Sequence, residues 1–227
     1  MGMLLYSLLA LVAGVTSVLA CSCGYSHPQD TFCSVDFVFL GWLRSNVKET
    51  EPNGSMTKKY EVTIRKVFKA RPNDFGFNEN MTVGILYTAS HDSLCGVEFL
   101  EKRVKFLFTG SYVDSQLNID ICTTIGSYGQ GPMPWAWVSK MQRKYLNRIY
   151  RENCECVVFD TSPYAYNSPH SSNSTCKWDS RGDHSECYER QTACIKDRKS
   201  HLGDCKWHNN PKMKACKQTK SSGFLEP

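Results

Sequence analysis

The chain has 227 residues, of which 27 are Lys or Arg, 22 are Asp or Glu and 12 are Cys. This length suits one large or two small domains. The formal net charge of +5 is mild, so it fits a solvated basic surface that can touch anionic matrix glycans and does not indicate a nucleic-acid partner.

Residues 1–20 predict a secretory signal peptide. They have no charged side chain, Leu4–Val12 form an apolar core, and Val18–Ala20 place small residues at the cleavage positions. The stretch is too short for a membrane span, and no later segment is long and apolar enough. Cleavage after residue 20 makes Cys21 the first residue, with a free α-amine. Cleavage after Ser17 is the alternative and leaves Cys21 internal. Either way, we expect a secreted, extracellular protein.

All twelve cysteines follow this signal. An even number of cysteines in a secreted chain predicts six disulfides and no free thiol. A structural zinc site is the alternative interpretation. However, Cys21-x-Cys23 and Cys154-x-Cys156 each have one intervening residue, where zinc sites usually have two to four. We therefore expect no cofactor of the protein's own.

The first half of the chain predicts a series of short strands. Pro28 suits the first turn of a short helix, and Val35–Leu43 reads as a strand buried on both faces. Further strands are predicted at Tyr60–Ile64, Met81–Tyr87, Val104–Phe108 and Leu117–Ile121, with loops at Ser45–Lys58, Arg71–Asn80 and His91–Gly96 and a short turn at Gly110–Ser115. Five strands with short antiparallel connections indicate a small closed barrel.

The pattern changes at Val138. Apolar residues then recur at helical spacing as far as Ile149, which predicts an amphipathic helix packed on the barrel. After Glu155 the chain is rich in Ser, Asn, Lys and Cys and poor in aliphatic residues, so this segment needs disulfides for stability. We place a domain boundary there, with an N-terminal domain over 21–155 and a C-terminal domain over 156–227.

Other short motifs carry weak signals. Acceptor triplets for N-linked glycans occur at Asn53, Asn80 and Asn173, and each predicts a surface position if a glycan is attached. Arg181-Gly182-Asp183 spells a tripeptide that some adhesion receptors bind, but three residues recur by chance and a solvated loop is the simpler interpretation. No phosphate-binding loop, catalytic triad or metalloprotease helix motif is visible, so the sequence gives no case for an enzyme.

A set of longer motifs, spread along the chain, is more specific than any of these. In order they are Cys21-Ser22-Cys23, His27-Pro28-Gln29, Phe32-Cys33, Tyr87-Thr88-Ala89, Ser93-Leu94-Cys95-Gly96, Cys122, Pro134-Trp135, Leu146-Asn147-Arg148, Cys154-Glu155-Cys156, Ala193-Cys194-Ile195-Lys196 and Cys205-Lys206-Trp207. Through them the chain resembles the tissue inhibitors of metalloproteinases. The resemblance covers nearly all of residues 21–156 and, more loosely, 176–207.

The resemblance implies a fold and a disulfide pattern. The fold is mainly β with helices: a netrin-like, five-stranded OB-fold barrel followed by a small disulfide-rich C-terminal domain. The implied pairs of the first domain are Cys21–Cys95, Cys23–Cys122 and Cys33–Cys154. In the second domain, alignment to the family suggests Cys156–Cys205 and Cys176–Cys194, leaving Cys187–Cys216 as a pair without a family counterpart. Six cysteines allow fifteen connectivities, so this second set is a hypothesis.

The resemblance also implies a function, namely inhibition of secreted or membrane-anchored zinc metalloproteinases of the matrix type by a monomeric protein. The α-amine and carbonyl of Cys21 are expected to chelate the catalytic zinc of the protease, because such zinc sites keep an open coordination position. Ser22 is expected to point into the S1′ pocket. Ser93 and Leu94, joined to Cys21 through Cys95, are expected to form a second contact. We call residues 21–25 and 93–95 together the wedge.

Two residues of the wedge depart from the family pattern. Family members usually have Pro where Tyr25 stands and often a larger residue where Gly24 stands. Gly24 loosens the backbone, and Tyr25 is bulky and is expected to contact the protease. Both residues therefore bear on the range of targets and on the affinity.

Two other functions compete with inhibition. One is a netrin-like matrix or receptor-binding module without inhibitory activity, which is favoured if Cys21 is not N-terminal. The other is a generic disulfide-rich structural protein. The wedge residues Ser22, Ser93 and Leu94 count against it, because a purely structural role does not need them.

Overall fold

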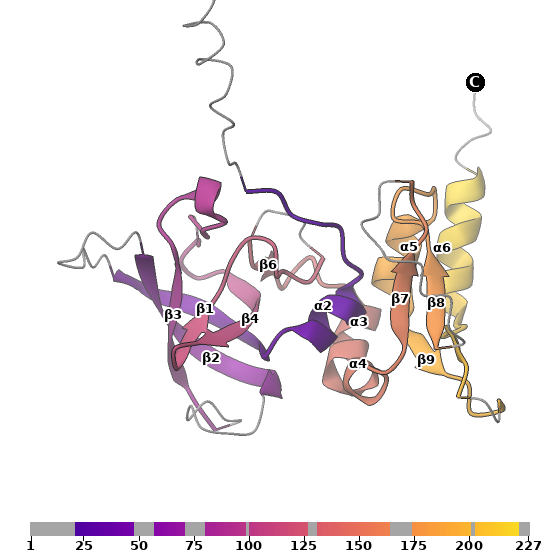
Figure 1. The fold of residues 1–227 in the computed structure, drawn as a ribbon, viewed down its shortest axis with the longest axis horizontal. Helices are drawn as coiled ribbons and strands as arrows, with labels where there is room; N and C mark the ends of the chain where they lie inside the picture. Colours follow the sequence, from indigo (N-terminus) through magenta and orange to yellow (C-terminus); the bar gives the residue numbers. More distant parts are fainter. Residues whose placement is uncertain are drawn as a thin grey trace, which may run out of the picture.

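The computed structural model describes residues 21–47, 57–70, 80–98, 100–126, 131–163, 174–200 and 203–222 (Figure 1). The predicted signal peptide, the acceptors Asn53 and Asn173, and most of the two loops predicted at Ser45–Lys58 and Arg71–Asn80 lie outside the described residues.

Five strands close a barrel in the first half of the chain: β1 (Phe37–Val47), β2 (Thr57–Ala70), β3 (Val83–Ala89), β4 (Lys105–Val113) and β5 (Gln116–Asn118). The order is β1-β2-β3-β5-β4, and β4 pairs back onto β1. The short β6 (Met133–Pro134) adds to the edge of β4. The predicted fold class, a five-stranded barrel with helices and a disulfide-rich C-terminal part, is confirmed. Consecutive strands run in opposite directions, and the one parallel pairing of the barrel joins β3 to β5, which are not consecutive in the chain.

Alternating side chains fill the barrel, as the period of the predicted strands requires. Tyr60, Val62 and Ile64 of β2 are buried inside it, and Phe39 of β1 stacks on Phe108 of β4 with ring centroids 5.1 Å apart. The Tyr60 hydroxyl donates to the carbonyl oxygen of Val97 at 2.8 Å, so this one polar group of the core is satisfied.

The turn predicted at Gly110–Ser115 is wrong in its extent. Strand β4 continues to Val113, and the turn consists of Asp114 and Ser115, whose φ angles are 48° and 63°. Gly110 is therefore a strand residue. A Cβ on it would lie 2.0 Å from the carbonyl oxygen of Asn118, so glycine is needed for close strand pairing and not for a turn.

A helical segment follows the barrel, as predicted. It comprises α3 (Lys140–Lys144), the π-helical turn η2 (Tyr145–Ile149) and α4 (Tyr150–Glu152). Ser139 caps its start in a reciprocal pair with Gln142, in which the Gln142 amide donates to Ser139 Oγ at 3.0 Å and the Ser139 amide donates to Gln142 Oε1 at 2.9 Å. Its buried aromatic and leucine side chains form a second core with the outer face of the barrel.

The C-terminal part consists of small elements joined by disulfides. β7 (Val157–Asp160) pairs in parallel with β8 (Thr175–Trp178), and β9 (Cys194–Lys196) pairs with β10 (Cys205–Trp207). The helices are α5 (Ser185–Gln191) and α6 (Pro211–Ser222). Three of the five buried residues of its core cluster are cysteines, as expected where apolar side chains are too few to form a core without them.

The chain between Tyr25 and Asp30 lies at the junction of these two parts, and Figure 1 shows α2 (Pro28–Ser34), in indigo, between the barrel and β7. Gln29 is buried there. Its side-chain amide donates to the carbonyl oxygens of Asn153 at 3.0 Å and Cys194 at 2.8 Å, and its Oε1 accepts from the Cys194 amide at 2.8 Å. One side chain thus supplies hydrogen bonds to backbone on both sides of the junction.

Two titratable groups lie at this junction, His27, which is buried, and Asp30, which is half-buried. The His27 ring accepts from the Gln29 amide through Nδ1, so Nε2 carries the proton and faces the Tyr188 carbonyl oxygen at 3.2 Å. Burial lowers the pKa of His27 to about 4. The Asp30 carboxylate accepts from the Val158 amide at 3.1 Å, but burial dominates and raises its pKa to about 7. Both groups are therefore neutral in the folded protein near pH 5.

These shifts predict opposite effects of pH on stability. Between about pH 4 and 6.5 the unfolded chain protonates His27 and ionises Asp30, so the two contributions offset each other in the wild type. In Asp30→Asn only His27 remains, and stability rises with pH through this window. We expect the unfolding free energy of Asp30→Asn relative to wild type to increase from pH 4 to 7, by up to about 1.4 kcal/mol per pH unit. Urea unfolding at four pH values, with disulfides intact, measures this difference, and a difference independent of pH contradicts the burial of a neutral Asp30.

Candidate functional site at the N-terminal segment

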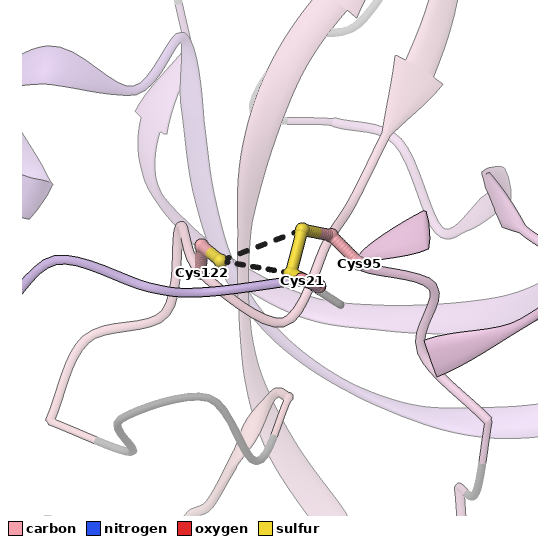
Figure 2. Close-up of side chains that lie close together, drawn as sticks. All are labelled: Cys21, Cys95 and Cys122. Atoms are coloured by element: carbon pink, nitrogen blue, oxygen red, sulfur yellow. Dashed lines mark hydrogen bonds between the residues drawn. A yellow bond between two sulfur atoms is a disulfide. The ribbon is translucent and has the colours of Figure 1, made fainter. Parts of the chain in front are cut away.

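Two disulfides hold the first three described residues. Cys21 is bonded to Cys95 and Cys23 to Cys122, with Cα–Cα distances of 5.1 and 5.0 Å. The two bridges touch, because Cys122 Sγ lies 3.5 Å from Cys21 Sγ and 3.7 Å from Cys95 Sγ. Figure 2 shows these three sulfurs together. All of them are in disulfides and have no hydrogen to donate, so the contacts are packing contacts that fix one bridge against the other.

The loop that carries Cys95 is closed by its own backbone. It follows β3 and contains the 3-10 turn η1 (Asp92–Leu94). The Cys95 amide donates to the Asp92 carbonyl oxygen at 2.8 Å, and the Gly96 amide donates to the His91 carbonyl oxygen at 2.9 Å. Cys95 itself has a φ of 62°, which turns the chain back towards the barrel.

The loop that carries Cys122 is fixed by an acidic side chain. Asp120 Oδ1 accepts from the amides of Cys122 and Thr123, both at 2.7 Å, which closes a turn there. The strand that we predicted to run on to Ile121 ends earlier, at Asn118. The Ile121 amide donates to the Cys95 carbonyl oxygen at 3.0 Å. The two loops that receive the disulfides are thus bonded to each other, which makes the support for residues 21–23 continuous.

The wedge residues that are not cysteines are exposed. Ser22, Gly24 and Ser93 are open to solvent, and Leu94 is 52% exposed at the tip of its turn. A Cβ on Gly24 would meet no atom within 4 Å. The structure therefore brings the two predicted stretches of the wedge together through Cys21–Cys95 and presents their remaining side chains outward.

Tyr25, which we expect to contact the protease, also contacts the C-terminal part of its own chain. It is 46% exposed, but its ring stacks on Trp178 with centroids 5.5 Å apart and planes at 26°, and its hydroxyl donates to Glu189 Oε1 at 3.4 Å. Sequence reasoning missed Trp178 and Glu189. The available signal was that Trp178 is one of the few large apolar residues in the cysteine-rich segment, where a core has to form around what apolar surface there is.

The twelve cysteines form six disulfides. Besides the two at the N-terminal segment they are Cys33–Cys154, which the resemblance implies, Cys156–Cys205 and Cys176–Cys194, which alignment to the family suggests, and Cys187–Cys216, the pair without a family counterpart. A comparison with protein-family models identifies residues 19–207 with the family described as tissue inhibitor of metalloproteinase. The chain belongs to this family. The family consists of protease inhibitors and not enzymes, so the chain is not an enzyme.

Curated relatives agree with the family. The chain is 29% identical to metalloproteinase inhibitor 3 of Xenopus laevis over 193 residues, which are 83% of the chain and 80% of the relative. It is 32% identical to metalloproteinase inhibitor 4 of Mus musculus over 165 residues, 70% of the chain and 67% of the relative. To metalloproteinase inhibitor 3 of Scyliorhinus torazame it is 29% identical over 140 residues, 61% of the chain and 58% of that relative, which is less than two thirds of the relative's length.

Within the described residues, the tissue-inhibitor chain has clusters of cysteine sulfurs that resemble a metal site. Within the described ranges, two groups of side chains have ligand spacing: Cys21 with Cys95 and Cys122, and Cys156 with Cys194 and Cys205. All six sulfurs are in disulfides, and metal ligation by cysteine requires a thiolate. None of the helices in the described part is long and apolar enough to cross a membrane.

Two weaker motifs are placed as follows. Asn80 is exposed in a turn before β3, where an acceptor for a glycan is accessible. Arg181 and Asp183 are exposed in the turn that leads into α5, and the Gly182 amide donates to the Asp179 carbonyl oxygen at 3.2 Å. This turn is closed by its own hydrogen bonds.

The backbone around Gly96 leaves no room for a side chain, so a substitution there tests how closely the Cys95 loop is packed. A Cβ at this position would lie 2.1 Å from the carbonyl oxygen of Ala89 and 2.7 Å from that of His91, so the loop must shift to accept Gly96→Ala. We expect a loss of about 1–3 kcal/mol of stability, seen as a lower melting temperature. Gly24→Ala is the matched control, because open space surrounds it. Equal melting temperatures for the two variants would show that the loop is not close-packed.

Proposed function

We propose that the protein is a secreted inhibitor of zinc metalloproteinases, and that it acts by placing the backbone of Cys21 on the catalytic zinc of the protease. The observation that carries the proposal is the fixation of Cys21. Its side chain is locked to Cys95 beside a second disulfide, so its backbone is held in place at a half-exposed position, in a chain of this inhibitor family. If the signal is removed after Ala20, this α-amine is free.

The chemistry of the amine and the carbonyl supports chelation. An α-amine and the carbonyl oxygen of the same residue form a five-membered ring with a metal ion, and catalytic zinc sites keep an open position for such ligands. The amine has to be neutral to donate its lone pair. With an ordinary pKa of about 7.7–8.0 it has a minor neutral fraction at pH 7, and binding to zinc releases the remaining proton.

The remaining wedge residues extend the contact. Ser22 follows the chelating residue directly and is exposed, so we assign it to the S1′ pocket of the protease. Ser93 and Leu94 are joined to Cys21 through Cys95 and contribute the second stretch. Because both stretches are fixed before binding, little conformational entropy is lost when the complex forms.

The disulfides and the charge of the chain also bear on its compartment and its partners. Six disulfides fit an oxidising, extracellular compartment. The partners are secreted or membrane-anchored zinc metalloproteinases, with anionic matrix glycans as a weaker partner of the basic surface. We assign the inhibitory domain to 21–155 and the disulfide-rich C-terminal domain to 156–227, and we expect a monomer that uses no cofactor of its own.

The chelation step has a direct test. One alanine added before Cys21 removes the free amine of Cys21 and occupies the space where the metal has to sit, but it removes no disulfide and no core contact. We expect inhibition of a matrix metalloproteinase catalytic domain to be abolished while the melting temperature stays within about 1 °C, because surface changes outside packed features cost little stability. The reference is protein that starts at Cys21, verified by N-terminal sequencing. Retained inhibition in the extended protein refutes chelation and favours the matrix or receptor-binding alternative.

The S1′ contact has a separate test. Ser22→Gly removes the side chain and leaves the chelating backbone, so we expect a roughly tenfold higher inhibition constant, of the order seen when one small group is lost from a pocket. Ser115→Gly is the matched control. It is exposed in the β4–β5 turn with a φ of 63°, where glycine fits without strain. Inhibition constants measured against several matrix metalloproteinases decide the point, and equal values for Ser22→Gly and wild type would remove Ser22 from the interface.

A further inference from the structure

The wedge is held at both of its ends, by the barrel at one and by the C-terminal part at the other. We propose that Trp178 and Glu189 are positioning residues that hold Tyr25 and thereby fix the direction in which residues 21–24 are presented. The effect on inhibition rests on the function proposed above, whereas the ordering of the segment does not.

The surface that receives Tyr25 is rigid. Trp178 is 2% exposed and ends β8, in which Cys176 is bonded to Cys194. Glu189 is buried on α5, and Ser185 Oγ donates to the same carboxylate oxygen at 2.8 Å that accepts from the Tyr25 hydroxyl. Tyr25 therefore packs on groups that are already fixed by other contacts.

A second residue strengthens the same contact. The His27 ring meets Trp178 edge-on, with centroids 5.3 Å apart and planes at 80°, and lies 5.3 Å from Trp207. Its Nε2 faces the Tyr188 carbonyl oxygen of α5. Trp178 thus contacts Tyr25 with one part of its ring system and His27 with another, so the chain on both sides of Ser26 is attached to the C-terminal part.

The need for this attachment comes from Gly24. It is the single residue between the Cys23–Cys122 disulfide and the Tyr25 stack, it is exposed, and a side chain there would touch nothing. A glycine without neighbours does not restrict its own φ and ψ. The Cys23–Cys122 disulfide fixes the chain only on the N-terminal side of Gly24. A second anchor immediately after Gly24 removes the freedom that the glycine leaves, and Tyr25 supplies that anchor.

The first experiment uses the free protein and no protease. We expect the backbone amide order parameter of Gly24, from ¹⁵N relaxation, to be near 0.85 in the wild type and to fall below about 0.6 in Tyr25→Ala. Tyr25→Phe keeps the stack on Trp178 but loses the hydrogen bond to Glu189, so we expect an order parameter for Gly24 between those of the wild type and Tyr25→Ala. A value equal to that of the wild type would remove Glu189 from the positioning residues. Val157→Ala, at an exposed position of the same C-terminal part, controls for a general loss of packing. An unchanged order parameter at Gly24 in Tyr25→Ala overturns the proposal, whether or not the protein inhibits any protease.

The second experiment separates positioning from a direct contact of Tyr25 with the protease. It is a double-mutant cycle with Tyr25→Ala and Trp178→Phe, the latter chosen because it keeps an aromatic ring in the buried site. Positioning predicts that Tyr25→Ala raises the inhibition constant by roughly two- to tenfold, the range of an aromatic pair. It also predicts that Trp178→Phe adds little in the Tyr25→Ala background. Additive losses indicate direct contact and overturn the proposal, as does an unchanged inhibition constant in Tyr25→Ala.

The two experiments also distinguish a failure of the proposal from a failure of the proposed function. If the wild-type protein inhibits no metalloproteinase, the proposed function fails, and the order parameter of Gly24 still decides whether Trp178 and Glu189 hold the segment.

Discussion

The contact between two disulfides is the constraint on which the rest of the wedge depends. Cys21–Cys95 and Cys23–Cys122 lie against each other, with sulfur atoms 3.5 and 3.7 Å apart, so the chain between residues 21 and 23 has both of its ends fixed. The barrel supplies the two loops that receive them. The Ile121 amide donates to the Cys95 carbonyl oxygen, so the Cys95 loop and the Cys122 loop are coupled to each other. The two disulfides are therefore attached to a support that is held by the sheet.

The junction explains why the two parts of the chain are linked more closely than their compositions indicate. No disulfide joins the cysteines of 21–155 to those of 156–227, which by itself favours independent domains. Yet Gln29 satisfies backbone groups of Cys194, His27 is buried against Tyr188, and the half-buried Asp30 accepts from the Val158 amide. A buried polar side chain left without its partner costs about 1–3 kcal/mol. Separating the parts therefore exposes or orphans groups that belong to the segment directly after the wedge.

Local sequence patterns predicted the strands of the barrel, but they did not predict the contacts between residues that are far apart in the sequence. Alternation in Tyr60–Ile64 and helical spacing after Val138 identified elements whose inner faces are decided by neighbours in sequence. Gly110 was misread because a glycine demanded by strand pairing and one demanded by a turn look alike in a single sequence. Five disulfide pairs came from family resemblance and alignment, and the sixth joins the two cysteines that were left, since spacing alone leaves many connectivities open. The contact of Tyr25 with Glu189 joins residues 164 positions apart, and no local pattern encodes a contact at that distance.

The disulfide without a family counterpart, Cys187–Cys216, supports the helix that contacts Tyr25. Cys187–Cys216 joins α5 to α6, and Lys217 of α6 donates to the Tyr188 hydroxyl at 2.7 Å while lying 4.4 Å from the centre of the Tyr188 ring. Tyr188 and Glu189 are the residues of α5 that face His27 and Tyr25. A helix of seven residues is too short to be stable alone. Fixing α5 to α6 therefore stabilises the surface on which the segment after Gly24 rests. It connects α6 to the wedge through one disulfide and the non-covalent contacts of α5.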